Sequence, residues 1–225
     1  MRFAPGSRAA VIGGRLAHQV YDELKQQLLA GAHQPGSALV VNDLCTEFGV
    51  SKQPVMEALR ALAGDRLVEI QPQVGVRVRD FSAHEVEAFF WFFARCEGSM
   101  ANRAAQFGTE AEMAELEVLC EELEQLEGSP DEVGQLGYRR GNREVHSLIH
   151  AMGRSALAAD ISYDLFDLSD FLIVTHGRGF SGRLAERNHG HREVLDAIRR
   201  RDPEAAEEAM RLHVLTSPLG GHQLA

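Results

Sequence analysis

Apolar residues near the start of the chain recur with the spacing of a helix. Every fourth residue of this segment is apolar, which predicts an amphipathic helix ended by Gly31. The residues of this stripe are Leu16, Val20, Leu24 and Leu28. The next stretch, HQPGSALV, has the composition of a turn. The pattern therefore predicts one helix followed by a loop.

Two shorter helices are predicted next, joined by a tight turn. In the first, NDLCTEF, Asn42 is the expected N-cap, and Gly49 stands where a left-handed C-cap residue belongs. Ser51 is the expected N-cap of the second, KQPVMEALRALAGD, in which Val55 and Leu59 point inward. Two short helices with a glycine in the turn between them predict a helix-turn-helix.

A strand-like pattern follows the second short helix. The segments LVEI and VRVR each alternate with period two, and QPQVG separates them. We expect a small hairpin, or wing, with Arg77 and Arg79 on the face opposite Val76 and Val78. The wing would complete a winged helix-turn-helix domain over residues 1–80.

Beyond Asp80 the pattern is helical throughout. The capping boxes SAHE and TEAE open two helices, and Asp202 followed by proline opens the last one. The other helices are predicted at about 135–152, 156–175 and 183–200. The fold class is therefore mainly α, with an all-helical domain over residues 81–225.

Charge divides the chain in the same way. The net charge is −10, but residues 1–79 hold nine Lys and Arg against seven Asp and Glu, and the remainder is strongly acidic. This asymmetry predicts two modules with different partners. The longest apolar run, AFFWFFA, is too short to cross a membrane, and three widely spaced cysteines suit a reducing cytoplasm.

The segment GVSKQPVMEALRALAGDRLVEIQPQVGVRV resembles the winged helix-turn-helix of GntR-family bacterial transcription regulators. LLAGAHQPGSALVVNDLCTEF is similar to the first two helices of the same domain. The acidic helical remainder resembles the FadR-type branch, whose FCD effector domain is a bundle of six or seven helices. The resemblance implies a homodimer that binds palindromic operator DNA under the control of a small metabolite.

The DNA-contacting positions depart from the family pattern. Many relatives carry arginines at three places that correspond here to Asn42, Lys52 and Met56, so one cation remains. Residues at the start of the recognition helix can reach base edges or phosphates, and cations on the wing can contact the backbone or the minor groove. The candidate DNA contacts are Ser51, Lys52, Gln53, Arg60, Arg77 and Arg79.

The stretch NREVHSLIH resembles a metal-binding fragment, and helical geometry sorts its members. At about 100° per residue, Asn142 and His146 lie at the border of the predicted core stripe. His150 lies about 150° from the centre of that stripe and is expected at the surface. The zinc-protease pattern needs a glutamate directly after the first histidine, where this chain has Ser147, so an enzyme is not expected.

Two further histidines occupy positions where apolar residues would be usual. His191 and His213 both face inward and are equidistant from the turn at residue 202, so in an antiparallel helix pair they should face each other. With Asn142 and His146 they would offer three imidazoles and one amide oxygen, a set that suits Zn²⁺ or Ni²⁺. Metal-binding FCD domains resemble this pattern but carry an aspartate where this chain has Asn142.

The prediction is a metabolite-responsive transcription regulator whose effector, a carboxylate, binds at the metal, with Arg95 as a candidate contact. One alternative is a metal-free FadR-type regulator that binds a fatty acid or acyl-CoA. The inward His191 and His213 argue against that alternative, because an acyl tunnel would be lined by apolar residues. The other alternative is a metal-dependent helical-bundle enzyme.

Overall fold

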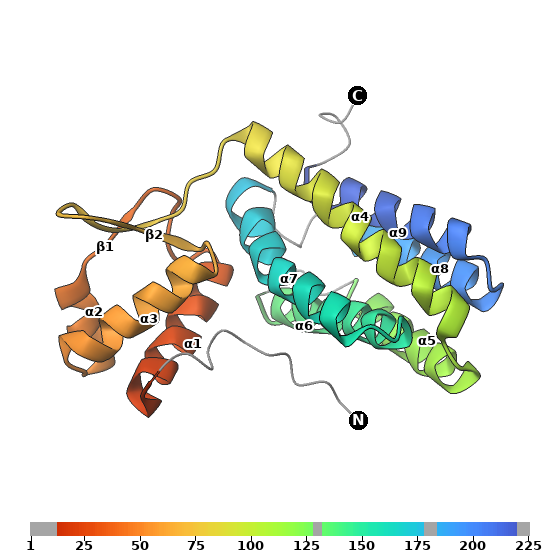
Figure 1. Cartoon of the computed structure of the whole chain (residues 1–225), viewed down its shortest axis with the longest axis horizontal. Helices are drawn as coiled ribbons and strands as arrows, with labels where there is room; N and C mark the ends of the chain where they lie inside the picture. The colour runs from red at the N-terminus through yellow and green to blue at the C-terminus, as the bar shows by residue number, and fades with distance from the viewer. Residues whose placement is uncertain (1–12, 128–131, 178–183, 220–225) are drawn as a thin grey trace.

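The computed structural model describes residues 13–127, 132–177 and 184–219, and its fold is mainly α. The N-terminal elements are α1 (Arg15–Leu29), β1 (Ala38–Leu39), α2 (Val41–Phe48), α3 (Lys52–Gly64), β2 (Val68–Gln71) and β3 (Gly75–Val78). The helices that follow are α4 (Ala83–Phe107), α5 (Glu110–Glu124), α6 (Glu132–Met152), α7 (Ala156–His176), α8 (Leu184–Arg199) and α9 (Pro203–Leu219). The winged helix-turn-helix and the helical bundle lie at opposite ends of the molecule (Figure 1).

The first helix packs against the second helix of the helix-turn-helix. Val20, Leu24 and Leu28 on α1 are buried, as are Leu59 and Leu62 on α3. The predicted stripe was wrong at Leu16, which is 54% exposed. Residues spaced by four drift about 40° per step around a helix, so the buried stripe runs through Ala17 instead.

The helix-turn-helix has the predicted Gly49 corner but a different start. Gly49 adopts a left-handed conformation with φ 64°. The prediction of Asn42 as N-cap was wrong, because α2 begins at Val41 and its N-cap is Val40, two residues before Asn42. The Val40 carbonyl accepts the backbone N–H groups of Asp43 and Leu44. Asn42 is therefore an exposed residue of the first turn.

The wing is part of a three-stranded antiparallel sheet in the order β1-β3-β2. Val76 and Val78 on β3 are buried, and Arg77 lies on the other face, as predicted. The strand β1 lies inside the stretch that was predicted to be only a turn. It pairs Ala38 with Arg77, and its two residues are too few to show an alternating pattern.

The bundle is built around α4, which packs against α6, α7, α8 and α9. In Figure 1, α4, α8 and α9 lie along one side of the bundle, and α6 and α7 lie along the other. Both predicted capping boxes form, at Ser82 with Glu85 and at Thr109 with Glu112. Asp202 accepts a hydrogen bond from the Ala205 backbone, as expected of the cap of α9.

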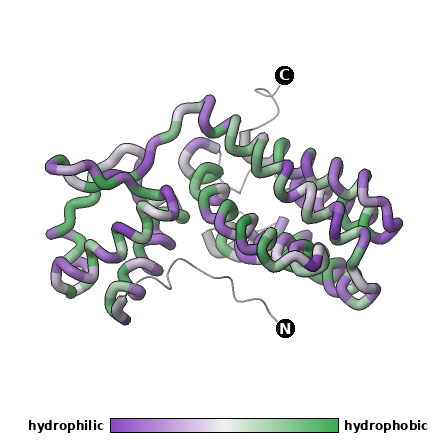
Figure 2. Tube along the Cα trace, in the orientation of Figure 1, coloured by the Kyte–Doolittle hydropathy of each residue, from purple (hydrophilic) through white to green (hydrophobic). Residues whose placement is uncertain are grey.

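Hydrophobic and hydrophilic residues are interspersed along the helices of the bundle (Figure 2). This is the pattern of helices that bury one side against their neighbours and expose the other to solvent. Among the described residues, no helix is both long and apolar enough to span a membrane.

The two domains are joined by charged contacts between α1 and the bundle. Lys25 on α1 forms an ion pair with Asp167 on α7, with 2.5 Å between Nζ and Oδ2. Arg139 on α6 donates a hydrogen bond of 2.7 Å to the Leu29 carbonyl at the end of α1. A methyl group added at Gly31 would lie 2.7 Å from Val174 on α7, so the backbone approaches the bundle closely there.

Candidate functional site

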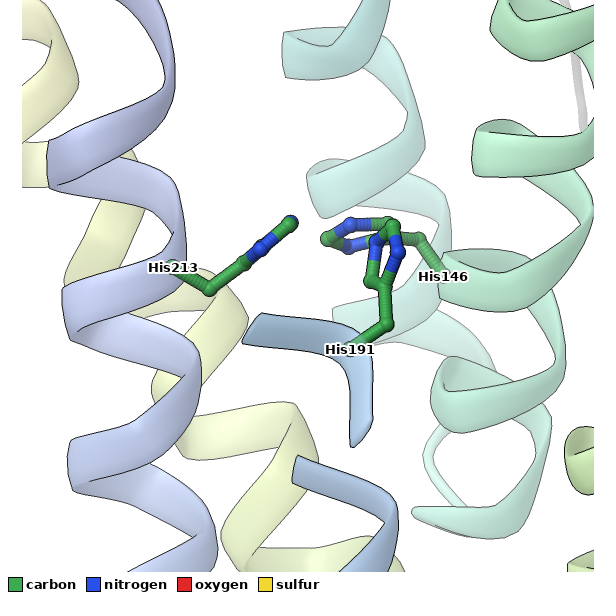
Figure 3. Close-up of side chains that lie close together, drawn as sticks. All are labelled: His146, His191 and His213. Atoms are coloured by element: carbon green, nitrogen blue, oxygen red, sulfur yellow. The ribbon is translucent and has the colours of Figure 1, made fainter. Parts of the chain in front are cut away.

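Three histidines from three helices converge inside the bundle. His146 comes from α6, His191 from α8 and His213 from α9, and all three are buried. Figure 3 shows their side chains pointing toward one another. The ring centres of His191 and His213 are 4.2 Å apart, and His146 lies 5.5 Å from each of them. The predicted pairing of His191 with His213 across the α8–α9 hairpin is thus confirmed.

The ring nitrogens of this cluster have the properties of metal ligands. One ligand atom from each histidine lies within 4.8 Å of the others. Among the described residues, neither nitrogen of His191 has a hydrogen-bond partner, and Nδ1 of His213 also lacks one. Buried polar atoms are nearly always paired, so these nitrogens fit a ligand such as a divalent cation.

Electrostatics keeps the two facing histidines neutral. Burial lowers the pKa of His191 well below its usual value, and the neighbouring His213 and His146 lower it further. Burial is also the largest cause of the lowered pKa of His213, followed by His146. Neutral imidazole is the form that coordinates a metal ion, so the site is prepared for one without loss of a proton.

A small cavity of about 20 Å³ adjoins the cluster. Its polar lining residues are Asn142, His146, Ser169, Asp170, Arg187 and His213. Asn142 is only 6% exposed, so the prediction that it shares the pocket with His146 agrees with its position. The volume is that of about one water molecule or ion. A larger cavity, of about 490 Å³, opens between α6 and α7 and includes Ser147, His150 and Tyr163 in its lining.

The prediction that His150 faces away from the core was wrong. His150 is 3% exposed, and its Nε2 lies 2.9 Å from the Glu97 carboxylate. His146 uses Nδ1 to contact the same carboxylate at 2.6 Å. Helix α6 packs against α5 on one side and against α4 and α7 on the others, so its buried arc is wider than its apolar stripe.

Glu97 is the buried residue that sequence reasoning missed. It lies on α4 and is fully buried, and the Ser162 hydroxyl also donates a hydrogen bond to it. Burial alone would raise the pKa of Glu97, but His150 and His146 lower it well below the usual range. One signal was present in the sequence: a glutamate between Ala94 and Gly98 on a helix side that is otherwise apolar or small.

Arg95 lies outside both cavities. It is exposed on α4, where its guanidinium stacks over the Trp91 ring at 3.7 Å from the centroid. The arginine that lines the histidine cavity is Arg187, which is 4% exposed. Arg187, not Arg95, is therefore the arginine in the lining of the cavity beside the histidines.

The candidate DNA contacts lie at the N-cap of α3, along α3, and on or next to β3. Ser51 is the N-cap residue of α3, although its side chain forms no capping hydrogen bond, and Lys52 and Gln53 open the helix. The side chains of Ser51, Lys52, Gln53, Arg60 and Arg77 are exposed, and Arg79 is half-buried. Arg79 stacks over Phe81, and Arg77 donates a hydrogen bond to the Gly36 carbonyl.

Two family models match the chain and together cover most of it. The model described as bacterial regulatory proteins, gntR family, matches residues 16–78, and the FCD domain model matches residues 92–216. The chain belongs to the GntR family. This regulator thus carries a DNA-binding domain followed by an FCD effector-binding domain, and the histidine cluster lies in the latter.

Curated relatives agree with this assignment. The HTH-type transcriptional repressor RspR of Escherichia coli strain K12 is 27% identical over 199 residues, which cover 87% of this chain and 84% of RspR. The HTH-type transcriptional repressor GlaR of the same strain is 27% identical over 202 residues, with coverage of 87% and 91%. These relatives are transcription regulators, which agrees with the expectation from NREVHSLIH of a regulator and not an enzyme.

Solved structures share the same fold. The regulator superposes on E. coli McbR/YncC with a TM-score of 0.72 and 22% identity, over 89% of this chain and 94% of that chain. A GntR regulator from Rhodococcus sp. RHA1 gives a TM-score of 0.66 and 23% identity, over 88% and 93%. The structural likeness therefore extends over both the winged domain and the helical bundle.

Proposed function

We propose that the regulator is a metal-dependent repressor that binds operator DNA and responds to a small organic acid. The observation that carries this proposal is the convergence of His146, His191 and His213 inside an effector-binding domain, where among the described residues both nitrogens of His191 and Nδ1 of His213 lack a partner. Repression is suggested by the names of the relatives RspR and GlaR. Action on operator DNA would place the protein in the cytoplasm, with residues 1–80 as its DNA-binding domain and 81–225 as its effector domain.

The proposed metal ligands are the three imidazoles and the amide oxygen of Asn142. Imidazole-rich sites of this kind suit Zn²⁺ or Ni²⁺. When bound, the metal would supply a Lewis-acidic position for a carboxylate. All four proposed ligands are neutral, so a metal ion here would carry no anionic ligand of its own and would attract an anion.

The proposed effector is a carboxylate that binds beside the metal. The polar lining of the cavity, with Arg187 and Asn142, favours an organic acid over an acyl chain. A volume of about 20 Å³ leaves no room for an organic acid, so its binding would require the side chains or helices around the cavity to separate. A ligand that fits only a more open bundle stabilises that conformation by its differential affinity.

The bundle would transmit this change to the DNA-binding domain through α6 and α7. Arg143, next to Asn142 on α6, forms ion pairs with Asp167 and Asp170 on α7. Asp167 in turn pairs with Lys25 on α1. A movement of α6 or α7 at the metal would therefore shift the anchor of α1, and in a homodimer it would change the spacing of the two DNA-binding domains.

Proposed DNA contacts follow from exposure and from the placement of α3 and the wing. The N-terminal end of α3, with Lys52 and Gln53, would enter the major groove, with Arg60 along the same helix. Arg77 and Arg79 on the wing would contact phosphates or the minor groove. The palindromic operator would match the symmetry of a homodimer.

The test is a pair of measurements on the wild type and on His213→Ala. We expect purified wild-type protein to bind about one zinc ion per chain and His213→Ala to lose most of it, because a tetrahedral zinc site depends on each of its few ligands. Fluorescence anisotropy with the intergenic DNA beside its own gene should then show binding that weakens with salt and changes when zinc and candidate acids are added.

A histidine outside the cluster provides the matched control. His189→Ala serves this purpose, because His189 lies on the same helix as His191 with a side chain 75% exposed. Binding of less than about 0.1 zinc per wild-type chain, or equal zinc in the wild type and His213→Ala, would contradict the metal proposal. Equal affinity for the intergenic DNA and a random duplex would contradict its action at that operator.

A further inference from the structure

Glu97 is a buried carboxylate directly behind the histidine cluster. It is fully buried, and its oxygens contact His146 Nδ1 at 2.6 Å and His150 Nε2 at 2.9 Å. Ser162 donates a further hydrogen bond to it. Burying a carboxylate without partners costs free energy of folding. The hydrogen bonds from α6 and α7 offset that cost for Glu97.

The contact with Glu97 decides which nitrogen of His146 is available to a metal. A carboxylate accepts hydrogen bonds only, so Nδ1 of His146 must carry the proton that it donates. The lone pair that remains belongs to Nε2, on the opposite edge of the ring. Metal-ligating histidines commonly donate their other N–H to a carboxylate, which fixes the ring and makes it a stronger ligand.

A second arrangement of ligands is possible on distance alone. Glu97, His146 and His150 also bring their ligand atoms within 4.8 Å of one another. These atoms already contact each other as hydrogen-bonding pairs at 2.6–3.0 Å, whereas those of His191 lack partners among the described residues. A metal ion is therefore expected at His146, His191 and His213, where nitrogens lack partners, and not at Glu97, His146 and His150, whose atoms are already hydrogen-bonded.

We propose that Glu97 is a positioning residue of the metal centre, which it does not touch directly. It orients His146 so that Nε2 faces His191 and His213, and it supplies through His146 the negative charge that the neutral Asn142 does not provide. His150 and Ser162 hold Glu97 in place. This inference rests on the proposed metal-binding function and adds a residue that acts one step behind the ligands.

The experiment compares zinc affinity in the full-length protein and in Glu97→Gln. Glutamine has the same shape and no charge, and its amide oxygen can still accept the hydrogen bond from His146. We expect zinc to bind Glu97→Gln about 10- to 100-fold more weakly, at unchanged stoichiometry. Adding Asn142→Asp to this variant should restore much of the affinity, because the charge returns at a ligand. Glu87→Gln, an exposed residue of the same helix, is the control and should bind zinc as the wild type does.

The outcomes separate this inference from the function on which it rests. Failure of the wild type to bind zinc contradicts the proposed function itself. Zinc binding by the wild type and equal affinity in Glu97→Gln contradict only the role of Glu97. His150→Gln should keep one zinc per chain, and complete loss in a folded His150→Gln protein would instead assign the metal to Glu97, His146 and His150.

A measurement on the wild type covers the case in which Glu97→Gln does not fold. In zinc-loaded protein labelled with ¹⁵N-histidine, His146 should show coordination through Nε2 and a slowly exchanging Nδ1–H proton, because that proton is buried against Glu97. Circular dichroism of each variant identifies any that is unfolded. Coordination through Nδ1 of His146 would overturn the proposal.

Discussion

Gly190 leaves the space that His213 occupies. A methyl group added at Gly190 on α8 would lie 2.6 Å from Nδ1 of His213 and 3.2 Å from its Cβ. Such a short distance forces the histidine, or all of α9, to move. The glycine therefore sets how closely the two helices approach at the metal centre.

Replacing Gly190 by alanine should weaken both zinc binding and stability. We expect a loss of about 1–3 kcal/mol in the free energy of unfolding from overpacking, and weaker zinc binding because His213 is displaced. Chemical denaturation and zinc titration measure the two effects. Gly137→Ala on α6 is the control, since its added methyl would meet only Leu126 at 3.6 Å. Wild-type zinc affinity in Gly190→Ala would show that the close approach is unimportant.

At the residue scale, the sequence predicted the three histidines and missed their carboxylate. His191 and His213 could be placed because antiparallel helices bring residues equidistant from a turn level with each other. His150 could not, because its burial depends on Glu97, 53 residues away along the chain. A charged residue on a neighbouring helix can extend a buried face beyond its apolar stripe. The spacing of residues within one helix does not reveal such a partner.

The start of α5 is fixed to the end of α6 by a charged pair. Glu112 completes the capping box of α5, and its two carboxylate oxygens accept hydrogen bonds of 2.6 and 2.5 Å from Arg154. The hydrogen bonds from Arg154 are the largest cause that lowers the pKa of Glu112, from 4.5 to about 2. The charged form of Glu112 is therefore favoured by folding.

This shift gives stability a defined pH dependence. A depressed carboxyl pKa contributes stability that is fully present above the unfolded value of about 4.5 and is lost as the pH falls toward 2. We expect Glu112→Gln to be less stable than the wild type at pH 7, and the difference in unfolding free energy to shrink between pH 5 and pH 3. Urea denaturation at each pH tests this.

A control separates this pair from the general effect of acid. Glu115→Gln, on the same helix, removes an exposed carboxylate for which the described structure contains no ion pair. Its difference from the wild type should stay close to zero across the range. A Glu112→Gln difference that stays constant from pH 7 to pH 3 would contradict the assigned pKa and the importance of Arg154.

At the element scale, prediction succeeded where the signal is local. Both capping boxes, the Gly49 corner and the cap at Asp202 depend on residues within one turn, and all of them form. The strand β1 depends on pairing with β3, 37 to 39 residues later along the chain, and α2 begins two residues after β1 ends. A two-residue strand stabilised from outside leaves too little local pattern to recognise.

At the scale of the whole molecule, the domain junction is a chain of alternating charges. Asp167 on α7 contacts Lys25 on α1 and Arg143 on α6, with distances of 2.5 and 2.7 Å. Burial alone would raise the pKa of Asp167, but Arg143 and Lys25 lower it, so the residue is charged. Tyr21 extends the junction by donating a hydrogen bond to Asp65, which also lies 3.6 Å from Lys25.

Asp167→Asn should uncouple the two domains without damaging the metal centre. The substitution removes the charge between Lys25 and Arg143, so α1 loses its ionic anchor on the bundle. We expect zinc affinity close to that of the wild type, while the ratio of operator affinities with and without zinc falls toward one. Fluorescence anisotropy gives that ratio. Asp196→Asn, an exposed residue of α8, is the control and should keep the wild-type ratio. A wild-type ratio in Asp167→Asn would mean that the signal passes between the domains by another route.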